Sequence, residues 1–195
     1  MPGVAPELAH EPLRPLLWRE YDRLVDLGTF DEDERIELLC GFLVAMSPQR
    51  ERHAYCITQL TRLLVPAVGN RALVRVQLPL AVSADSEPEP DISVVAPGDY
   101  LDGHPKTANI VIEVADESLH RDLGIKARLY AAAGVPEYWV VDLKHGRIEA
   151  HSSVSEGRYA RIRRHTRGET LRLHAFPGVR LRIDDALPPL RSKTK

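Results

Sequence analysis

Residues 110–114 read Ile-Val-Ile-Glu-Val, an apolar run that contains a single carboxylate. A short run rich in β-branched residues is typical of a strand that is buried on both faces of a sheet. Glu113 is unexpected there, because a buried carboxylate needs a cation, a proton or hydrogen-bond donors. The alternative is that Glu113 faces solvent on an edge strand. The run therefore predicts a central strand with a functional carboxylate or an ordinary edge strand.

The segments around this run have strand and helix patterns of their own. Residues 91–95 and 138–141 are short apolar runs that predict two further strands. Between them, residues 119–133 have a helical pattern that Gly134 and Pro136 bring to an end. Strands that alternate with helices in this way are typical of a sheet covered by helices.

The rest of the chain adds shorter elements. We expect a helix over 16–27, a hairpin over 35–39 and 42–46, a helix from Ser47-Pro48, a strand over 74–82, an antiparallel pair over 147–153 and 159–166, and an edge strand after residue 178. The helix from Ser47 is expected because Ser caps helices and Pro fits the first turn. Its apolar face would carry Ala54, Ile57, Leu60, Leu64 and Val65.

This order predicts an α/β or α+β fold with a mixed central sheet flanked by helices. A single domain over residues 16–187 is expected, with a Pro-rich arm at 1–15 and a disordered tail at 188–195. With 195 residues, 44% of them hydrophobic, the chain can bury a sizeable core. It has no apolar stretch near the ~20 residues of a membrane helix and no signal peptide, so a cytoplasmic protein is expected. Cys40 and Cys56 alone exclude a disulfide framework or a Cys-type zinc site.

Charge is divided unevenly along the chain. Residues 1–100 carry a formal charge of −7 and residues 101–195 a charge of +5. This asymmetry suits a protein that binds a polyanion and also holds a cation, although ordinary domains show it too.

Asp91 is the second candidate carboxylate. It opens a predicted strand directly after Pro90, and taken alone Pro-Asp is a common turn signal. Together with Glu113, however, it would place two carboxylates at the ends of neighbouring strands. Hard oxygen ligands of this kind suit Mg²⁺ or Mn²⁺ better than zinc.

Lys126 is notable because only five of the 26 basic residues are Lys. It lies on the predicted helix after Glu113, with Asp122 four residues before it and Tyr130 four residues after it. One interpretation is an exposed Asp122–Lys126 pair worth a few tenths of a kcal/mol. The other is a compact ammonium chosen to contact a phosphate oxygen or an attacking water.

Three further residues are weaker candidates. Glu37 has apolar neighbours in the predicted hairpin, and a solvent-facing position on a half-buried strand would explain it equally well. His53 lies on a predicted helix and Gln77 on the polar side of a predicted strand. Lone residues of these types are more often structural than functional.

Several blocks of this sequence resemble the Uma-two family of restriction-endonuclease-like proteins, within the PD-(D/E)XK nuclease superfamily. The similar blocks are Arg35–Gly41, Met46-Ser47-Pro48, Ser86–Asp91, Glu113-Val114 with Ser118, Asp122 and Lys126, Tyr130-Ala131, and Gly134–Asp142. The resemblance spans about residues 20–185, and its most distinctive block is Gly-Val-Pro-Glu-Tyr-Trp-Val-Val-Asp.

The resemblance implies a metal-dependent phosphodiesterase that hydrolyses DNA, with Glu37, Asp91, Glu113 and Lys126 as its catalytic set. Asp91, Glu113 and the Val114 carbonyl would hold Mg²⁺ or Mn²⁺, and His53, Gln77 and Asp122 would be accessory. Two departures stand out: Ala115 occupies the usual position of the core lysine, which Lys126 would replace, and Cys40-Gly41 replaces the usual Asp-Gly turn.

The remaining expectations concern partners. Arg158, Arg161, Arg163 and Arg164 on the predicted strand over 159–166 could contact DNA phosphates, or could simply keep an exposed edge soluble. A homodimer is expected because duplex cleavage needs two sites, with the apolar segment 176–190 as its candidate surface. Two other functions stay open: a non-catalytic binding or assembly module that keeps the fold, and a metal hydrolase of another substrate.

Overall fold

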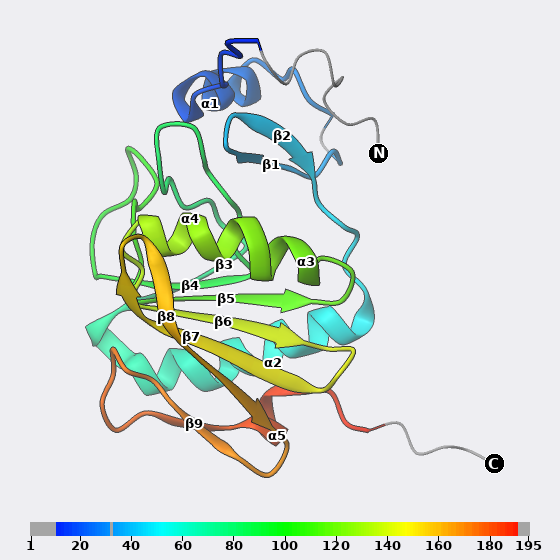
Figure 1. The fold of residues 1–195 in the computed structure, drawn as a ribbon, viewed down its shortest axis with the longest axis vertical. Coiled ribbons are helices and arrows are strands. Elements are labelled where there is room, and N and C mark those ends of the chain that lie inside the picture. Colours follow the sequence, from blue (N-terminus) through cyan, green and yellow to red (C-terminus); the bar gives the residue numbers. More distant parts are fainter. Residues whose placement is uncertain (1–10, 32, 191–195) are drawn as a thin grey trace, which may run out of the picture.

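A six-stranded sheet forms the centre of the computed structural model, which describes residues 11–31 and 33–190 (Figure 1). Its strands, in spatial order, are β3 (Leu73–Val76), β4 (Ile92–Val95), β5 (Ile110–Ala115), β6 (Glu137–Asp142), β7 (Arg147–Ser155) and β8 (Arg158–Thr166). Within this sheet β5 and β6 are parallel and the other neighbours are antiparallel. The predicted mixed sheet with flanking helices is confirmed.

Helices cover both faces of the sheet (Figure 1). α2 (Glu51–Val68) packs on one face, in a core that includes Ile112 and Trp139. On the other face lie α3 (Leu119–Arg121) and α4 (Ala127–Ala132), joined by a π-helical turn over Asp122–Lys126. β5 therefore turns Ile110, Ile112 and Val114 toward α2, and Val111 and Ala115 toward α4.

α2 begins later than the sequence suggests. Its N-cap is Arg50, so the expected start at Ser47-Pro48 is wrong, and these residues belong to an irregular connection from β2. The buried face consists of Cys56, Ile57, Leu60, Leu64 and Val68, whereas Ala54 and Val65 are exposed. The helix also continues through Pro66.

The expected N-terminal elements are present. α1 (Trp18–Asp26) is followed by the hairpin of β1 (Ile36–Leu39) and β2 (Phe42–Ala45). The turn Cys40-Gly41 has positive φ at both residues, as tight hairpins require, so the replacement of Asp by Cys leaves this geometry intact. The Leu38 carbonyl accepts a hydrogen bond from the Glu87 amide at 2.8 Å, which fixes β1 beside the segment leading into β4.

Two expected strands differ in the structure. The strand over 74–82 ends at Val76, because Gln77 has φ 50° and Pro79 cannot donate to a ladder. The expected edge strand after residue 178 exists as β10 (Arg180–Arg182), but it pairs with β9 (Thr170–Arg172) in a separate two-stranded sheet.

The C-terminal segment belongs to the core. Phe176, Val179, Leu181 and Leu187 are buried together with α5 (Ile183–Ala186) in the cluster that α2 covers. The expectation that residues 176–190 offer an apolar dimer surface is therefore wrong, because all of their large apolar side chains except Leu190 are packed within the chain.

Residues 1–10 and 191–195, on which most of the expected arm and tail fall, lie outside the described residues. Within the described ranges, no helix has both the length and the apolar character needed to cross a membrane.

Candidate active site

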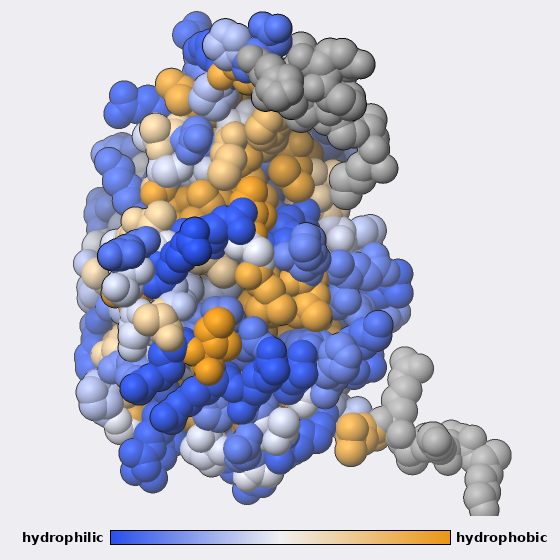
Figure 2. Space-filling model, viewed as in Figure 1, coloured by the Kyte–Doolittle hydropathy of each residue, from blue (hydrophilic) through white to orange (hydrophobic). Residues whose placement is uncertain are grey.

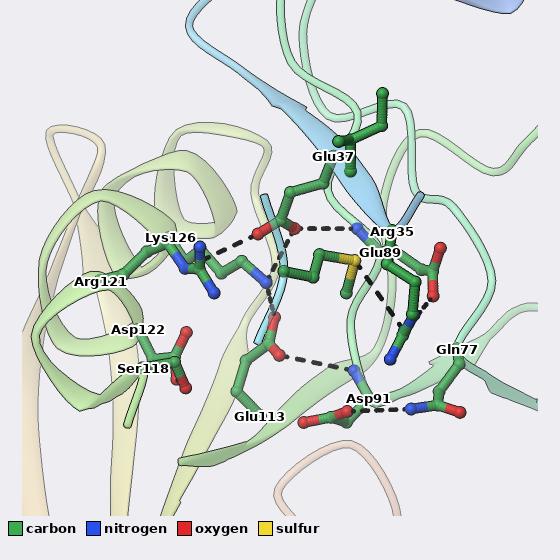
Figure 3. A network of polar contacts seen from close by, with 12 residues as sticks. Arg35, Glu37, Gln77, Glu89, Asp91, Glu113, Ser118, Arg121, Asp122 and Lys126 are labelled. Atoms are coloured by element: carbon green, nitrogen blue, oxygen red, sulfur yellow. Dashed lines mark hydrogen bonds and ion pairs between the residues drawn. The ribbon is translucent and has the colours of Figure 1, made fainter. Parts of the chain in front are cut away.

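Asp91 and Glu113 lie side by side where β4 begins and β5 ends (Figure 3). The antiparallel pair Ile92–Ile112, continued by one residue, places the two carboxylates opposite each other on one face of the sheet. Side chains in such a pair have Cβ atoms about 5 Å apart. The Val114 amide donates to Asp91 Oδ2 at 2.8 Å, and the Asp91 amide lies 3.5 Å from Glu113 Oε2.

Lys126 lies between two carboxylates. Its Nζ is 2.9 Å from Glu113 Oε1 and 2.9 Å from Glu37 Oε2, and its side chain is only 3% exposed (Figure 3). The exposed Asp122–Lys126 pair considered from the sequence is therefore wrong. An ammonium has three donors, and these two carboxylate oxygens account for two of them.

The helix that carries Lys126 is not a regular α-helix. Between α3 and α4 its backbone widens into the π-helical turn, which ends at Lys126, and such turns are frequent at functional sites. One turn later, Tyr130 Oη donates to Glu113 Oε1 at 2.7 Å. The sequence shows the i+4 spacing of Lys126 and Tyr130 but does not predict Tyr130 in the site, since the spacing does not show which strand that face meets.

Glu37 reaches the site from β1 on the hairpin. Its Oε2 also accepts a hydrogen bond from the Glu89 amide at 3.2 Å, and its Oε1 lies 3.7 Å from Arg121 Nε. The side chain is buried, so the solvent-facing interpretation of Glu37 is wrong. The hairpin thus brings a third carboxylate to the Asp91–Glu113 pair from a distant part of the chain.

Two of the three expected accessory residues contact Asp91. His53 Nε2, at the start of α2, lies 3.1 Å from Asp91 Oδ2, and Gln77 Nε2 donates to Asp91 Oδ1 at 3.4 Å. Gln77 owes its position to the turn that ends β3. Asp122 is buried nearby and accepts a 2.5 Å hydrogen bond from Ser118 Oγ.

The buried charges shift one another's pKa values. Burial raises the pKa of Glu113 to about 8, with Asp122, Asp91 and Glu37 adding to the shift and Lys126 opposing it. Burial alone would lower the pKa of Lys126, but Glu113, Glu37 and Asp122 raise it, so the ammonium stays charged. The site holds more carboxylates than cations, which favours a further positive charge.

The carboxylates open onto a small cavity of about 50 Å³, lined by Asp91, Glu113 and Lys126 together with Ser47, Arg50 and Ser118. Glu113 Oε1 takes two short hydrogen bonds, but Glu113 Oε2 and Asp91 Oδ1 each have only one long one, of 3.5 and 3.4 Å. These two oxygens can therefore act as hard ligands. Among the described residues no three His, Cys, Asp or Glu side chains are grouped as metal ligands, so the Val114 carbonyl or water would have to complete the set.

The arginines expected to bind DNA lie apart from this cavity. The row Glu113–Val140–Glu149–Arg164 crosses β5 to β8, so Arg164 is about 14 Å from Glu113 at 4.7–4.9 Å per strand. Arg164 Nε is also paired with Glu149 Oε2 at 2.7 Å. Arg158, Arg161 and Arg163 share β8 with it, and their contact with DNA stays a prediction.

Comparison with known proteins gives a family for this arrangement. A family model described as "Uma2: Putative restriction endonuclease" matches residues 18–184, a range that contains Glu37, Asp91, Glu113 and Lys126. The crystal structure of a "putative nuclease belonging to DUF820" from Anabaena variabilis ATCC 29413 matches with a TM-score of 0.70. The match covers 88% of this chain and 97% of that one at 14% identity, which shows a shared fold. A search of curated proteins gave no match. On the strength of the family model, the chain belongs to the Uma2 family of restriction-endonuclease-like proteins.

Proposed function

We propose that this protein is a divalent-metal-dependent endonuclease that hydrolyses phosphodiester bonds in DNA. The observation that carries the proposal is the buried Lys126 ammonium, held between Glu113 and Glu37 beside the Asp91–Glu113 pair. Burying these charges is costly, which is typical of groups kept for a function. Together with membership of a nuclease family, this supports a catalytic role for the cluster.

The donor set fits Mg²⁺ or Mn²⁺. Asp91 Oδ1, Glu113 Oε2 and the Val114 carbonyl would hold the ion, since the two carboxylate oxygens have few other partners and the carbonyl belongs to a residue lining the cavity. When bound, the ion would act as a Lewis acid that lowers the pKa of water and offsets charge on the phosphate.

The protein side chains have separable roles in this proposal. Lys126 would use its remaining donor to orient the attacking water or to contact a non-bridging phosphate oxygen, where charge develops in the transition state. Glu37 and Tyr130 would be positioning residues. Glu37 fixes the Lys126 ammonium, and Tyr130 helps to turn Glu113 Oε1 away from the ion. His53 would orient Asp91 by donating to Oδ2.

We also infer that the protein acts in the cytoplasm and as two copies. Two copies are expected because cutting both strands of a duplex requires two sites, and two-fold symmetry supplies them. With most apolar side chains of residues 176–190 buried, the exposed neighbours Phe42 and Leu43 on β2 are our candidates for the contact, among other exposed apolar residues. Light scattering at working concentration would test this, since a monomer mass would contradict it.

Incubation of the purified protein with supercoiled plasmid, in Mg²⁺, Mn²⁺ or EDTA, tests the proposed activity. We expect nicked and linear DNA with either metal, none in EDTA, and none for Asp91→Ala. A matched control is Lys144→Ala, which removes an exposed lysine in the turn after β6. A binding module would shift the DNA without nicking it, and a hydrolase of another substrate would do neither. An RNA substrate run in parallel decides between the two nucleic acids.

A further inference from the structure

A second cavity lies between β8 and β9, away from Asp91 and Glu113. It measures about 310 Å³, within the ~300–1,000 Å³ of ligand pockets. Its floor is formed by small residues of β7, Ala150 and Ser152. Arg163 and His165 of β8 line one side, and Arg172 and His174 line the other. We call this feature the β8–β9 groove.

The two arginines of the groove, like Arg158 and Arg161 of β8 and Arg180 of β10, have no acidic partner within 4.0 Å among the described residues, whereas other arginines nearby do. Arg147, Arg164, Arg167 and Arg182 all lie within 4.0 Å of an aspartate or glutamate. Among the described residues, no ion pair of this kind involves Arg163 or Arg172. Both side chains are exposed, so their donors are available to a ligand.

The one carboxylate that lines the groove is already occupied. Glu137 Oε1 accepts from Trp139 Nε1 at 2.9 Å, and Glu137 Oε2 accepts from the His174 amide at 2.8 Å. Glu137 is also buried, with 1% exposure, so it does not neutralise the guanidinium groups at the mouth. The groove therefore combines two unpaired guanidinium groups with hydroxyl and imidazole groups, which is an environment for an anion.

We infer that the β8–β9 groove binds a backbone phosphate of the DNA, with Arg163 and Arg172 as its principal contacts. A guanidinium fork matches phosphate oxygens, and such contacts position a nucleic acid without reading its sequence. The inference rests on the proposed function for the identity of the ligand. The row Ile112–Trp139–Ala150–Arg163 places Arg163 about 14 Å from β5, on the face of the sheet that α2 covers. Glu113 lies on the opposite face, so a DNA that contacts both regions has to pass over the β8 edge of the sheet.

This inference divides the arginines of β8. Arg163 would contact the ligand, and Arg164, paired with Glu149, would not. The alternative, that the β8 arginines only keep an edge strand from pairing with other chains, predicts no dependence of DNA affinity on Arg172. Figure 2 shows a mostly hydrophilic surface over the region of β8 and β9, which either role would produce.

The test is the salt dependence of DNA binding, measured by fluorescence anisotropy with a labelled 20-base-pair duplex in EDTA. Each phosphate contact contributes about 0.9 to the slope of log K against log salt. We expect the double variant Arg163→Ala/Arg172→Ala to lower the slope by about 2 and to weaken binding roughly tenfold at 0.1 M salt. The charge-conserving Arg163→Lys/Arg172→Lys should keep most of the slope. The control pair Arg23→Ala/Arg62→Ala, exposed on α1 and α2, should behave as wild type.

An unchanged slope in the groove variant, or an equal loss in the control pair, would overturn the inference, as would a wild-type protein that does not bind the duplex. Inorganic phosphate could also raise the melting temperature of the wild type but not of the groove variant. If the groove variant then binds DNA like wild type, the ligand is free phosphate and the inference is wrong. Groove-dependent binding by a protein that never nicks DNA would refute the proposed endonuclease and leave this inference standing. Nicking by a protein whose salt slope does not change in the groove variant would support the proposed endonuclease and refute the inference about the groove.

Discussion

Glu113 and Glu137 are both buried glutamates, on the neighbouring strands β5 and β6, yet their surroundings differ. Glu113 Oε1 accepts hydrogen bonds from Lys126 and Tyr130. Its Oε2 faces the cavity and accepts one long hydrogen bond, from the Asp91 amide. Glu137 has one neutral donor on each oxygen, from Trp139 and the His174 amide. Burial raises the pKa of both carboxyls. The proposed metal ligand Glu113 therefore differs from Glu137 in having a cationic partner and an oxygen with no short hydrogen bond.

The largest expected effect on nicking comes from removing the Lys126 ammonium beside Glu113. Lys126→Met should reduce plasmid nicking about a hundredfold or more, because the lost contact is made mainly in the transition state. It should also lower the free energy of unfolding by about 3 kcal/mol, since Glu37 and Glu113 are left without their partner. Nicking assays and urea unfolding measure the two effects, with Lys144→Met as control.

Lys126→Arg should fail to restore nicking, because the planar guanidinium does not fit between the two carboxylates as the ammonium does. Wild-type nicking by Lys126→Met would show that Lys126 has only a structural role, and the site assignment would then be wrong.

Exchanging each glutamate for glutamine tests the comparison directly. Glu113→Gln should lower nicking about a hundredfold and abolish the rise in melting temperature on adding Mg²⁺, because an ion ligand is lost. Glu137→Gln should keep nicking within about threefold but lower the free energy of unfolding by about 1–3 kcal/mol, since one buried donor loses its acceptor. If the two variants show the same pattern, the distinction drawn between the glutamates fails.

Glu87 extends the comparison to a buried carboxyl that has neither a lysine partner, as Glu113 has, nor a hydrogen-bond donor on each oxygen, as Glu137 has. Its Oε2 has no hydrogen-bond partner within the described part of the chain, and burial, with Asp22 adding to it, raises its pKa to about 8. The folded state therefore holds this proton more tightly than the unfolded state. The stability that results is complete below the unfolded pKa and is lost as pH rises through about 8.

Glu87→Gln mimics the protonated form, so it should unfold like wild type near pH 4, below the pKa of an unfolded glutamate. At pH 9.5 it should be more stable than wild type by on the order of 1 kcal/mol. Urea unfolding in EDTA across this range measures the difference. Parallel pH profiles for the two proteins would contradict it.

The smallest expected effect is that of Tyr130→Phe. It removes one of the two short hydrogen bonds to Glu113 Oε1 and leaves Lys126 in place. We expect a three- to tenfold loss of nicking, which corresponds to about 1 kcal/mol for one hydrogen bond. A loss as large as that of Lys126→Met would mean that Tyr130 contacts the reacting groups itself.

The strand elements around Glu113 could be predicted because each depends on local pattern. Residues 110–114 and 138–141 are apolar runs whose burial follows from composition, and Glu113 stood out within one of them. The proximity of Lys126 to Glu113 was also accessible, because a helix that follows a strand packs back on the sheet. Position along the chain and periodicity were sufficient for these features.

Features that depend on tertiary contacts could not be predicted. The early end of β3 depends on the backbone of Gln77, which then meets Asp91. Ser47-Pro48 has the local signals of a helix start, yet these residues line the cavity and α2 begins only at Glu51. Residues 176–190 looked like an exposed apolar surface because the sequence does not show that they fold back beneath the sheet.

The π-helical turn at Asp122–Lys126 affects how this chain can diverge. A π turn contains one residue more than an α turn, so deleting one residue within it would leave a regular α turn and keep Ser118 and Lys126 on nearly the same face of the helix. Gly124, within the turn, has open space where a Cβ would lie and no positive φ, so other residues fit there. Relatives that keep this site should therefore vary in the identity of this residue, and some should have a regular α turn with one residue fewer between Ser118 and Lys126.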